Sequence, residues 1–125
     1  MVKRSALIIE DDPKLCVIYQ TALQQAGFET DLDSTGNQFS DKLSAMRPDL
    51  VILDIHLPYA SGKDILDQIR SDERWAKAVV IVTTADLLLS KSLEKQADYV
   101  LIKPVSVGRL MKIVASCWPD EVKPY

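Results

Sequence analysis

The stretch Leu50-Val51-Ile52-Leu53-Asp54 decides the fold, because a continuous apolar run ends abruptly in a carboxylate. Three more runs have the same character: Leu7-Ile8-Ile9, Val79-Val80-Ile81-Val82 and Val100-Leu101-Ile102. Short, continuous, largely β-branched runs are typical of strands covered on both faces, as in a parallel sheet. A fifth candidate, Phe28 to Leu32, alternates with polar residues, which is typical of an edge strand.

Helical periodicity fills the intervals between these runs. After Asp12 as N-cap and Pro13 in the first turn, apolar residues recur at Leu15, Ile18, Ala22, Leu23 and Ala26, and Gly27 provides a stop. Further helices are predicted over 39–46, from about 62 to 70, near 87–96 and over 107–118. Five strand–helix repeats predict an α/β domain with a parallel sheet, right-handed crossovers and helices on both faces.

Composition sets limits on the class of protein. The 125 residues suffice for one domain, and 47% hydrophobic and 26% charged residues are ordinary for a soluble globular chain. The sequence has neither a membrane-spanning run nor a secretory signal, and a net charge of −3 with scattered basic residues does not favour direct nucleic-acid binding. Cys16 and Cys117, both in predicted helices, are read as reduced thiols of a cytoplasmic protein, with a disulfide between them as the alternative.

Acidic and polar residues follow the predicted strands directly. The first strand ends in Glu10-Asp11-Asp12, the third in Asp54, the fourth in Thr83-Thr84 and the fifth in Lys103. In an open parallel sheet, ligands bind at the carboxyl ends of the strands, so these residues are expected to converge. Carboxylates that converge repel one another, and a hard cation such as Mg²⁺ relieves that repulsion.

The acidic turn after the first strand also restricts the ligand. A free phosphate ester is usually cradled by backbone N–H groups of a Gly-rich turn, whereas this turn is acidic and leads into a proline. A phosphoryl group would therefore arrive with a cation and become bonded to a carboxylate, for which Asp54 is the candidate nucleophile. Lys103 and a threonine hydroxyl could then neutralise and bind the phosphoryl oxygens.

In order and spacing, LIIEDDP, VILDIHLPYASG, VIVTTAD and LIKPV resemble the receiver domain of bacterial two-component response regulators. Pro58 and Gly62, four and eight residues after Asp54, belong to the same pattern. The resemblance covers nearly the whole chain. It implies a flavodoxin-like (βα)5 fold, a doubly wound sandwich whose five parallel strands have the order 2-1-3-4-5.

The resemblance also implies a role for each site residue. Asp54 becomes the phosphoacceptor for a sensor histidine kinase or a histidine phosphotransfer protein. Asp11 and Asp54 would ligate Mg²⁺ directly, with the backbone carbonyl of His56 as a further ligand. Glu10 would act mainly through a coordinated water, whereas Asp12 is better explained as a helix cap.

The family places a switch hydroxyl at the end of the fourth strand. Counting without gaps from Gly62 and Arg70 assigns Thr84 to that position and Ala85 to the following small residue, which leaves Thr83 as the last strand residue. The choice of Thr84 over Thr83 is therefore a prediction.

Two features depart from the family pattern. Val100 stands three residues before Lys103, where receivers commonly have Tyr or Phe, and Tyr99 could replace that aromatic only if the strand shifted its register. The short span from Thr84 to Lys103 predicts an abbreviated fourth helix, in the region that most receivers use for signalling.

Three other features have competing interpretations. His56 either tunes the lifetime of the phosphoryl group, together with Asp86, or is an exposed loop residue of little effect. Within Leu87-Leu88-Leu89, core packing is expected to account for two residues, and a partner patch is the alternative. In the family, the peptide bond before the residue equivalent to Pro104 is cis.

Residues 1–119 are predicted to form the receiver domain, and residues 120–125 a solvated tail or a truncated link to an output domain. The predicted partner is the phosphodonor protein, and a homodimer through the fourth helix, fifth strand and fifth helix is left open. Neither nucleic acid nor membrane is an expected partner.

The principal functional hypothesis is a signalling switch. Such a protein is not expected to be an enzyme, apart from catalysing its own phosphorylation and slow dephosphorylation. A pseudo-receiver, which binds partners without being phosphorylated, is the first alternative. A phosphatase with an aspartyl intermediate is the second, but such enzymes usually have an acid where this chain has His56.

Overall fold

The computed structural model describes residues 3–122, in which strands and helices alternate along the chain. The strands are β1 (Ser5–Ile9), β2 (Glu29–Asp33), β3 (Leu50–Asp54), β4 (Val79–Thr84) and β5 (Tyr99–Ile102). The helices are α1 (Pro13–Gln25), α2 (Phe39–Met46), α3 (Gly62–Ser71), α4 (Leu87–Leu93) and α5 (Val107–Cys117). The alternation predicted from hydrophobic periodicity is confirmed, with bounds that differ by one to three residues at several ends.

All strand pairs are parallel, and the order in the sheet is β2-β1-β3-β4-β5. This order confirms the predicted flavodoxin-like topology and places β2 at an edge. The order reverses beside β1, so the carboxyl ends of β1 and β3 lie next to each other at the point where such sheets bind ligands.

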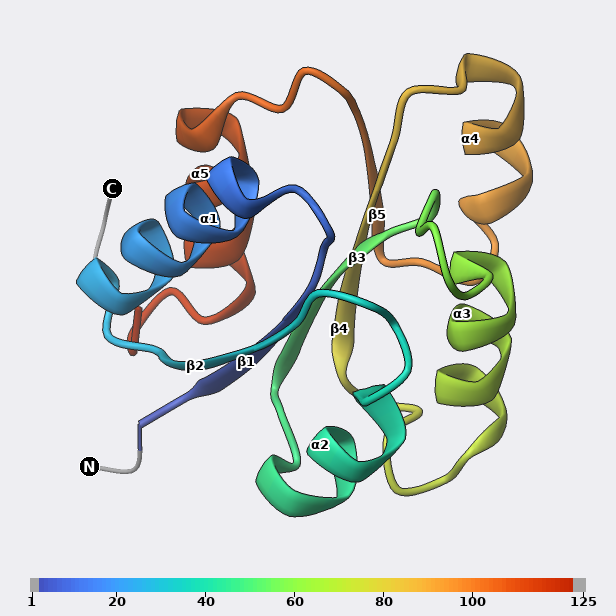
Figure 1. The fold of residues 1–125 in the computed structure, drawn as a ribbon. Helices are drawn as coiled ribbons and strands as arrows, with labels where there is room; N and C mark the ends of the chain where they lie inside the picture. The colour runs from blue at the N-terminus through green and yellow to red at the C-terminus, as the bar shows by residue number, and fades with distance from the viewer. Residues whose placement is uncertain (1–2, 123–125) are drawn as a thin grey trace.

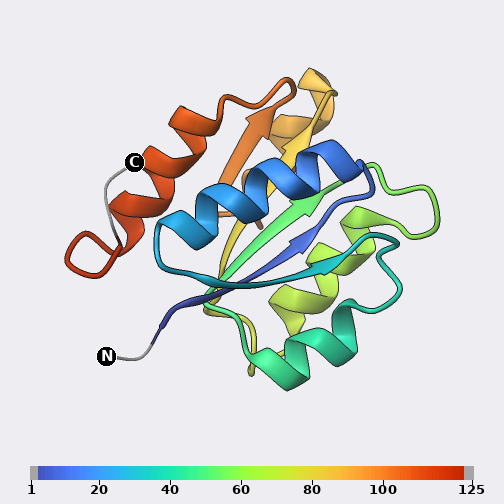
Figure 2. The ribbon, with the colours of Figure 1, turned by 60° about the vertical axis from the view of Figure 1, so that its left-hand side comes forward.

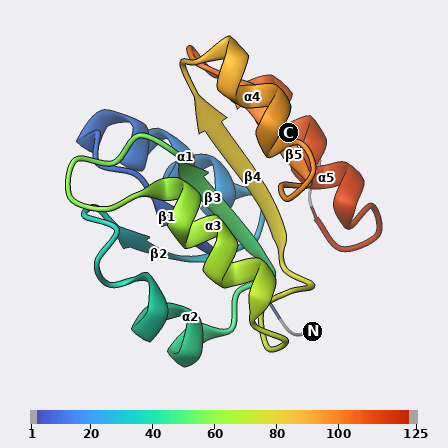
Figure 3. The same cartoon turned by 90° about the vertical axis from the view of Figure 1, so that its right-hand side faces the viewer.

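The sheet lies between two layers of helices (Figure 1). Helices α1 and α5 cover one face, and α2, α3 and α4 cover the other; Figures 2 and 3 show the two layers from further directions. Each face has its own core cluster, one built around Ile8, Ile52 and Ile81 and the other around Leu7, Val51 and Val80. Because side chains of a strand alternate between faces, every central strand supplies both clusters. No helix of the described chain has the length and apolar character needed to cross a membrane.

Helix α1 begins as predicted, and Ala22, Leu23 and Ala26 of the predicted stripe are buried, but the stripe differs at Ile18. The side chain of Asp12 accepts hydrogen bonds from the amides of Lys14 and Leu15. The fully buried positions include Cys16 and Tyr19, whereas Ile18 is 42% exposed. The predicted stripe was wrong at Ile18, because aromatic and thiol side chains, which an aliphatic count omits, occupy the face that packs on the sheet.

The differences at other boundaries are small. Strand β2 lies one residue further along than predicted, and β4 includes Thr84, so Thr83 is not its last residue. Helix α4 has seven residues, which confirms the expected abbreviation. Both cysteines are free, and the Lys103–Pro104 peptide bond is cis, as the family implied.

One residue of the exposed segment after α5 is packed against the core. Glu121 accepts a hydrogen bond from the side chain of Arg4 at 2.6 Å, and Val122 is only 6% exposed within the cluster under α1 and α5. The expectation of a solvated tail was wrong for Val122, because its apolar side chain completes that core, whereas Asp120 and Glu121 are exposed. Residues 123–125 lie outside the described part.

The leucines of α4 are more exposed than predicted. Leu87 and Leu88 are 68% and 88% exposed, and only Leu89 packs against the core. Core packing therefore accounts for one of the three, since a seven-residue helix presents only a narrow inner face, which Leu89 and Leu93 occupy.

The register of β5 shows that Tyr99 does not occupy the position expected for the family's aromatic residue, which is taken by Val100. Val100 pairs with Val82 and packs in the cluster on the α4 side, whereas Leu101 belongs to the opposite cluster. By alternation, Tyr99 lies on the face of Leu101, away from α4. The position that faces α4 therefore has a valine, and the suggested substitution by Tyr99 is wrong.

Gly62 fixes how α3 meets β3. A Cβ atom at this position would lie 2.5 Å from the Cα of Ile55 and 2.6 Å from its carbonyl oxygen, and both are backbone atoms that cannot move aside easily. The absence of a side chain thus allows the start of α3 to lie against the segment that follows Asp54.

We expect Gly62→Ala to lower the free energy of unfolding by about 1–3 kcal/mol, because the added methyl forces the backbones apart. Urea denaturation followed by circular dichroism measures this change. Gln68→Ala, on an exposed position of the same helix, is the matched control and should stay within about 0.5 kcal/mol of the wild type. Equal stability of the two variants would contradict the close backbone contact.

Candidate functional site

Three carboxylates meet at the carboxyl edge of the sheet. Glu10 and Asp11 follow β1, Asp54 ends β3, and one oxygen from each lies within 4.8 Å of the others. Glu10 is 1% and Asp54 is 3% exposed, while Asp11 is open to solvent. The residues that the sequence singled out at these two strand ends are therefore brought together.

A lysine ammonium group bridges the two buried carboxylates. Lys103, just after β5, places its Nζ 3.1 Å from Oε1 of Glu10 and 3.2 Å from Oδ2 of Asp54. Its backbone amide donates to the carbonyl of Thr84 at 2.8 Å, which anchors the start of the β5–α5 loop to β4. The lysine is thus held at the cluster by both its backbone and its side chain.

The pKa values of this group reflect burial and mutual repulsion. Burial, followed by the adjacent carboxylate of Asp54, raises the pKa of Glu10 from 4.5 to about 7. Burial opposes the charge on Lys103, but its hydrogen bond to Glu10 and the charges of Glu10 and Asp54 outweigh that effect and raise the pKa of Lys103. The single positive charge of Lys103 therefore does not balance the negative charges of both carboxylates.

The donor set fits a hard divalent cation. The cluster offers carboxylate oxygens from Glu10, Asp11 and Asp54, and Asp11 is open to solvent, where coordinated waters can remain. Mg²⁺ prefers such sites, with one or two carboxylates and several waters. A cation there would also offset the repulsion by Asp54 that, together with burial, raises the pKa of Glu10.

The two threonines at the end of β4 have different surroundings. Thr84 is fully buried, and its Oγ1 accepts a hydrogen bond from the amide of Asp86 and shares another with Nε2 of His56, each at 3.0 Å. Thr83 lies opposite Asp54 in the β3–β4 register, but its buried hydroxyl has no hydrogen-bond partner among residues 3–122. By alternation its side chain faces α1 and α5.

Tyr19 of α1 has the second buried hydroxyl without a partner in the described chain. Burial, and then the charge of Glu10, raises the pKa of Tyr19 to about 12, so its phenol stays neutral. Both Tyr19 and Ile81, the neighbour of Thr83 on its face of β4, belong to the core cluster under α1 and α5. Sequence patterns had not marked Tyr19, because only the rotation of α1 turns it inward.

Other polar residues at this edge have structural roles. The carboxylate of Asp33 accepts hydrogen bonds from the amides of Thr35, Gly36 and Gln38 and so closes the turn after β2. The side chain of Asp86 accepts from two amides in the first turn of α4. Asp33 therefore caps a turn and Asp86 caps a helix. Asp33 was missed in the sequence because the predicted strand ended before it.

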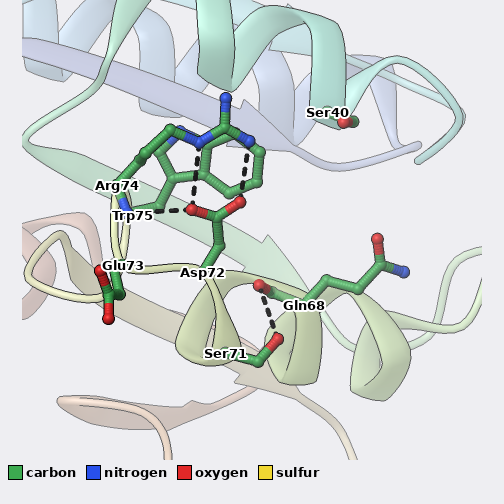
Figure 4. Close-up of a pocket in the computed structure, with 7 residues that line it drawn as sticks. All are labelled: Ser40, Gln68, Ser71, Asp72, Glu73, Arg74 and Trp75. Carbon is green, nitrogen blue, oxygen red and sulfur yellow. Dashed lines mark hydrogen bonds and ion pairs between the residues drawn. The ribbon is translucent and has the colours of Figure 1, made fainter.

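A polar hollow lies elsewhere on the molecule, beside the end of α3 (Figure 4). Its lining residues are Ser40, Gln68, Ser71, Asp72, Glu73, Arg74 and Trp75. Asp72 and Arg74 are paired at 2.8 Å, and the Arg74 guanidinium group lies 4.4 Å from the centre of the Trp75 ring. These charges satisfy each other, and no residue of the carboxylate cluster borders the hollow.

Stability should depend on pH through Glu10. Its pKa is raised from 4.5 to about 7 in the folded chain, so folding takes up a proton in this window and stability falls as the pH rises through it. In a chelator, Glu10→Gln should match the wild type near pH 4.5 and be more stable at pH 8. Urea denaturation at both pH values tests this.

Adding Mg²⁺ at pH 8 should reverse the order, because the wild type binds the cation better than Glu10→Gln. Glu29→Gln, at an exposed position of β2, is the control and should follow the wild type throughout. A difference between Glu10→Gln and the wild type that is constant across the window would contradict the raised pKa.

Comparison with known proteins points to one family. Residues 6–115 match the response regulator receiver domain family. The DNA-binding response regulator MtrA of Mycolicibacterium smegmatis is 33% identical over 114 residues, which are 88% of this chain and 48% of that protein. The chain therefore spans about half the length of the MtrA relatives that it matches.

Solved structures agree on the fold. The signal receiver domain of a protein described as a Luxo repressor, from Vibrio parahaemolyticus, is 27% identical with a TM-score of 0.82, over 92% of this chain and 89% of that one. The receiver domain of the sensor histidine kinase PA1611 from Pseudomonas aeruginosa, solved with a magnesium ion in its active site cleft, is 24% identical. Its TM-score is 0.80, over 92% of this chain and 97% of that one. With its sheet order, its acidic strand ends and the match over residues 6–115, this chain belongs to the response regulator receiver domain family.

Proposed function

We propose that this chain is a phosphoacceptor switch of a two-component phosphorelay. Asp54 receives the phosphoryl group from a histidine kinase or a histidine phosphotransfer protein. The observation that carries the proposal is the cluster of Glu10, Asp11 and Asp54, bridged by Lys103 at the edge where receiver sheets bind ligands.

Asp11 and Asp54 would hold Mg²⁺, with the backbone carbonyl of His56 as a further ligand and Glu10 acting through a water. The magnesium ion in the receiver domain of PA1611 supports this assignment. When bound, the cation would supply charge neutralisation for the carboxylates and the phosphoryl oxygens.

In the transfer step, a carboxylate oxygen of Asp54 forms a bond to phosphorus while the P–N bond of a phosphohistidine breaks. The electron pair of the broken bond stays on the imidazole nitrogen. Lys103, already 3.2 Å from Asp54, can turn its ammonium group to a phosphoryl oxygen, and Thr84 can donate its hydroxyl hydrogen to another. Buried donors positioned in this way stabilise the developing charge.

The signal would leave the site through α4 and β5. Thr84 lies two residues before Asp86, which caps α4, so movement of the threonine toward Asp54 displaces the start of this helix. Leu87 and Leu88, exposed in the first turn of α4, then change position at the surface. A partner or a second copy that reads this surface would sense phosphorylation.

Incubation with Mg²⁺ and acetyl phosphate should add one phosphoryl mass to the wild type and none to Asp54→Asn, because asparagine lacks the nucleophilic carboxylate. Intact mass spectrometry measures the adduct, and a chelator should abolish it. No adduct with any donor would indicate the pseudo-receiver instead. Steady turnover of unrelated phosphate esters would indicate a phosphatase.

We expect Thr84→Ala to weaken the conformational change that accompanies phosphorylation more than Thr83→Ala does. The hydroxyl of Thr84 is joined to the loops beside Asp54, whereas Thr83 faces α1 and α5. Amide chemical shifts of α4, compared with and without phosphorylation, measure the change. Equal effects, or a larger effect of Thr83→Ala, would refute the assignment of Thr84.

A further inference from the structure

The side chain of His56 links the loop after Asp54 to the end of β4, beside the backbone hydrogen bond from the amide of Ile55 to the carbonyl of Thr83. Its Nε2 lies 3.0 Å from Oγ1 of Thr84, although the residue as a whole is exposed. We propose that His56 is a positioning residue that holds Thr84 away from Asp54 until the phosphoryl group arrives. The inference rests on the proposed function and assigns His56 a regulatory role within it.

The hydrogen-bonding capacity of a threonine hydroxyl explains why this contact matters. A hydroxyl has one hydrogen and two lone pairs. The amide of Asp86 donates to Oγ1 of Thr84, and the imidazole of His56 engages either the hydrogen or the second lone pair, depending on its tautomer. Neither bond is with Asp54, so both favour the position of Thr84 seen here.

The backbone of His56 is held relative to the phosphoacceptor. Its backbone amide donates to Oδ1 of Asp54 at 2.9 Å, and its backbone forms an isolated bridge with Ser61. The imidazole therefore reaches Thr84 from a fixed base rather than from a free loop. We expect a movement of Thr84 toward a phosphoryl oxygen on Asp54 to break its bond to the imidazole.

The size of the effect follows from the net contribution of one hydrogen bond. Such bonds stabilise by about 0.5–1.5 kcal/mol, which corresponds to roughly 2- to 10-fold in an equilibrium constant. Because the histidine is exposed and water competes for its ring, the effect should not exceed this range. The contact would thus shift the equilibrium of Thr84 toward the position seen here without preventing its movement.

The test uses beryllofluoride with Mg²⁺, an analogue of a phosphoryl group that binds to aspartate reversibly. His56→Ala should bind the analogue about 2- to 10-fold more tightly than the wild type, because no bond to Thr84 must be broken. His56→Gln, whose amide can reach the same hydroxyl, should restore the wild-type affinity. Tyr59→Ala, 73% exposed in the same loop, is the control and should have no effect.

A double-mutant cycle separates the contact with Thr84 from any direct effect on the analogue. In a Thr84→Val background the hydroxyl is absent, so His56→Ala should no longer change the affinity. Persistence of the full effect in that background would overturn the proposal, as would equal affinities of His56→Ala and the wild type.

A second measurement needs no analogue. In the free protein, His56→Ala should change the side-chain rotamer populations of Thr84, read from three-bond scalar couplings that do not depend on the imidazole ring current, and His56→Gln should restore them. Unchanged rotamer populations in His56→Ala would overturn the inference by themselves. If His56→Ala changes the rotamer populations but the wild type never binds beryllofluoride, the proposed function is refuted and the contact is supported.

Discussion

The ammonium group of Lys103, held between the carboxylates of Glu10 and Asp54, is the interaction on which the site depends. Two buried carboxylates cannot both remain ionised at close range without positive charge nearby. The lysine supplies one charge, and the pKa of Glu10, raised to about 7 by burial and by Asp54, indicates that more is needed. The fold therefore keeps a local charge deficit at the edge of the sheet.

The central strands that hold this deficit are deeply buried. Every residue of β3 is buried, and each central strand supplies side chains to both core clusters. Close-packed interiors resist gradual deformation, so a change of charge at Asp54 is expressed at loops rather than within strands. The side-chain contacts beside Asp54 that can rearrange are those that join Thr84 to His56 and to Asp86 at the start of α4.

Sequence patterns were most accurate where a residue's role follows from its place on a strand. The acids after β1 and β3 were predicted to converge, because parallel strands bring their carboxyl ends to one edge. They were least accurate on helices, where Ile18 was expected inside and Tyr19 was found there. A period of 3.6 residues defines a stripe, but only contacts with the sheet select its rotation.

By itself, the sequence determined the alternation of strands and helices and the identity of the residues at the carboxyl edge, because β-branched runs and terminal acids are local signals. The strand order and the family followed from the resemblance of four ordered motifs to receiver domains. The tertiary structure alone decided that the hydroxyl of Thr84 bonds to His56, that Val100 rather than Tyr99 faces α4, and that Val122 closes a core. Those outcomes depend on register and packing between segments far apart in the chain. No local pattern encodes them, since each contact forms only after the layers have assembled.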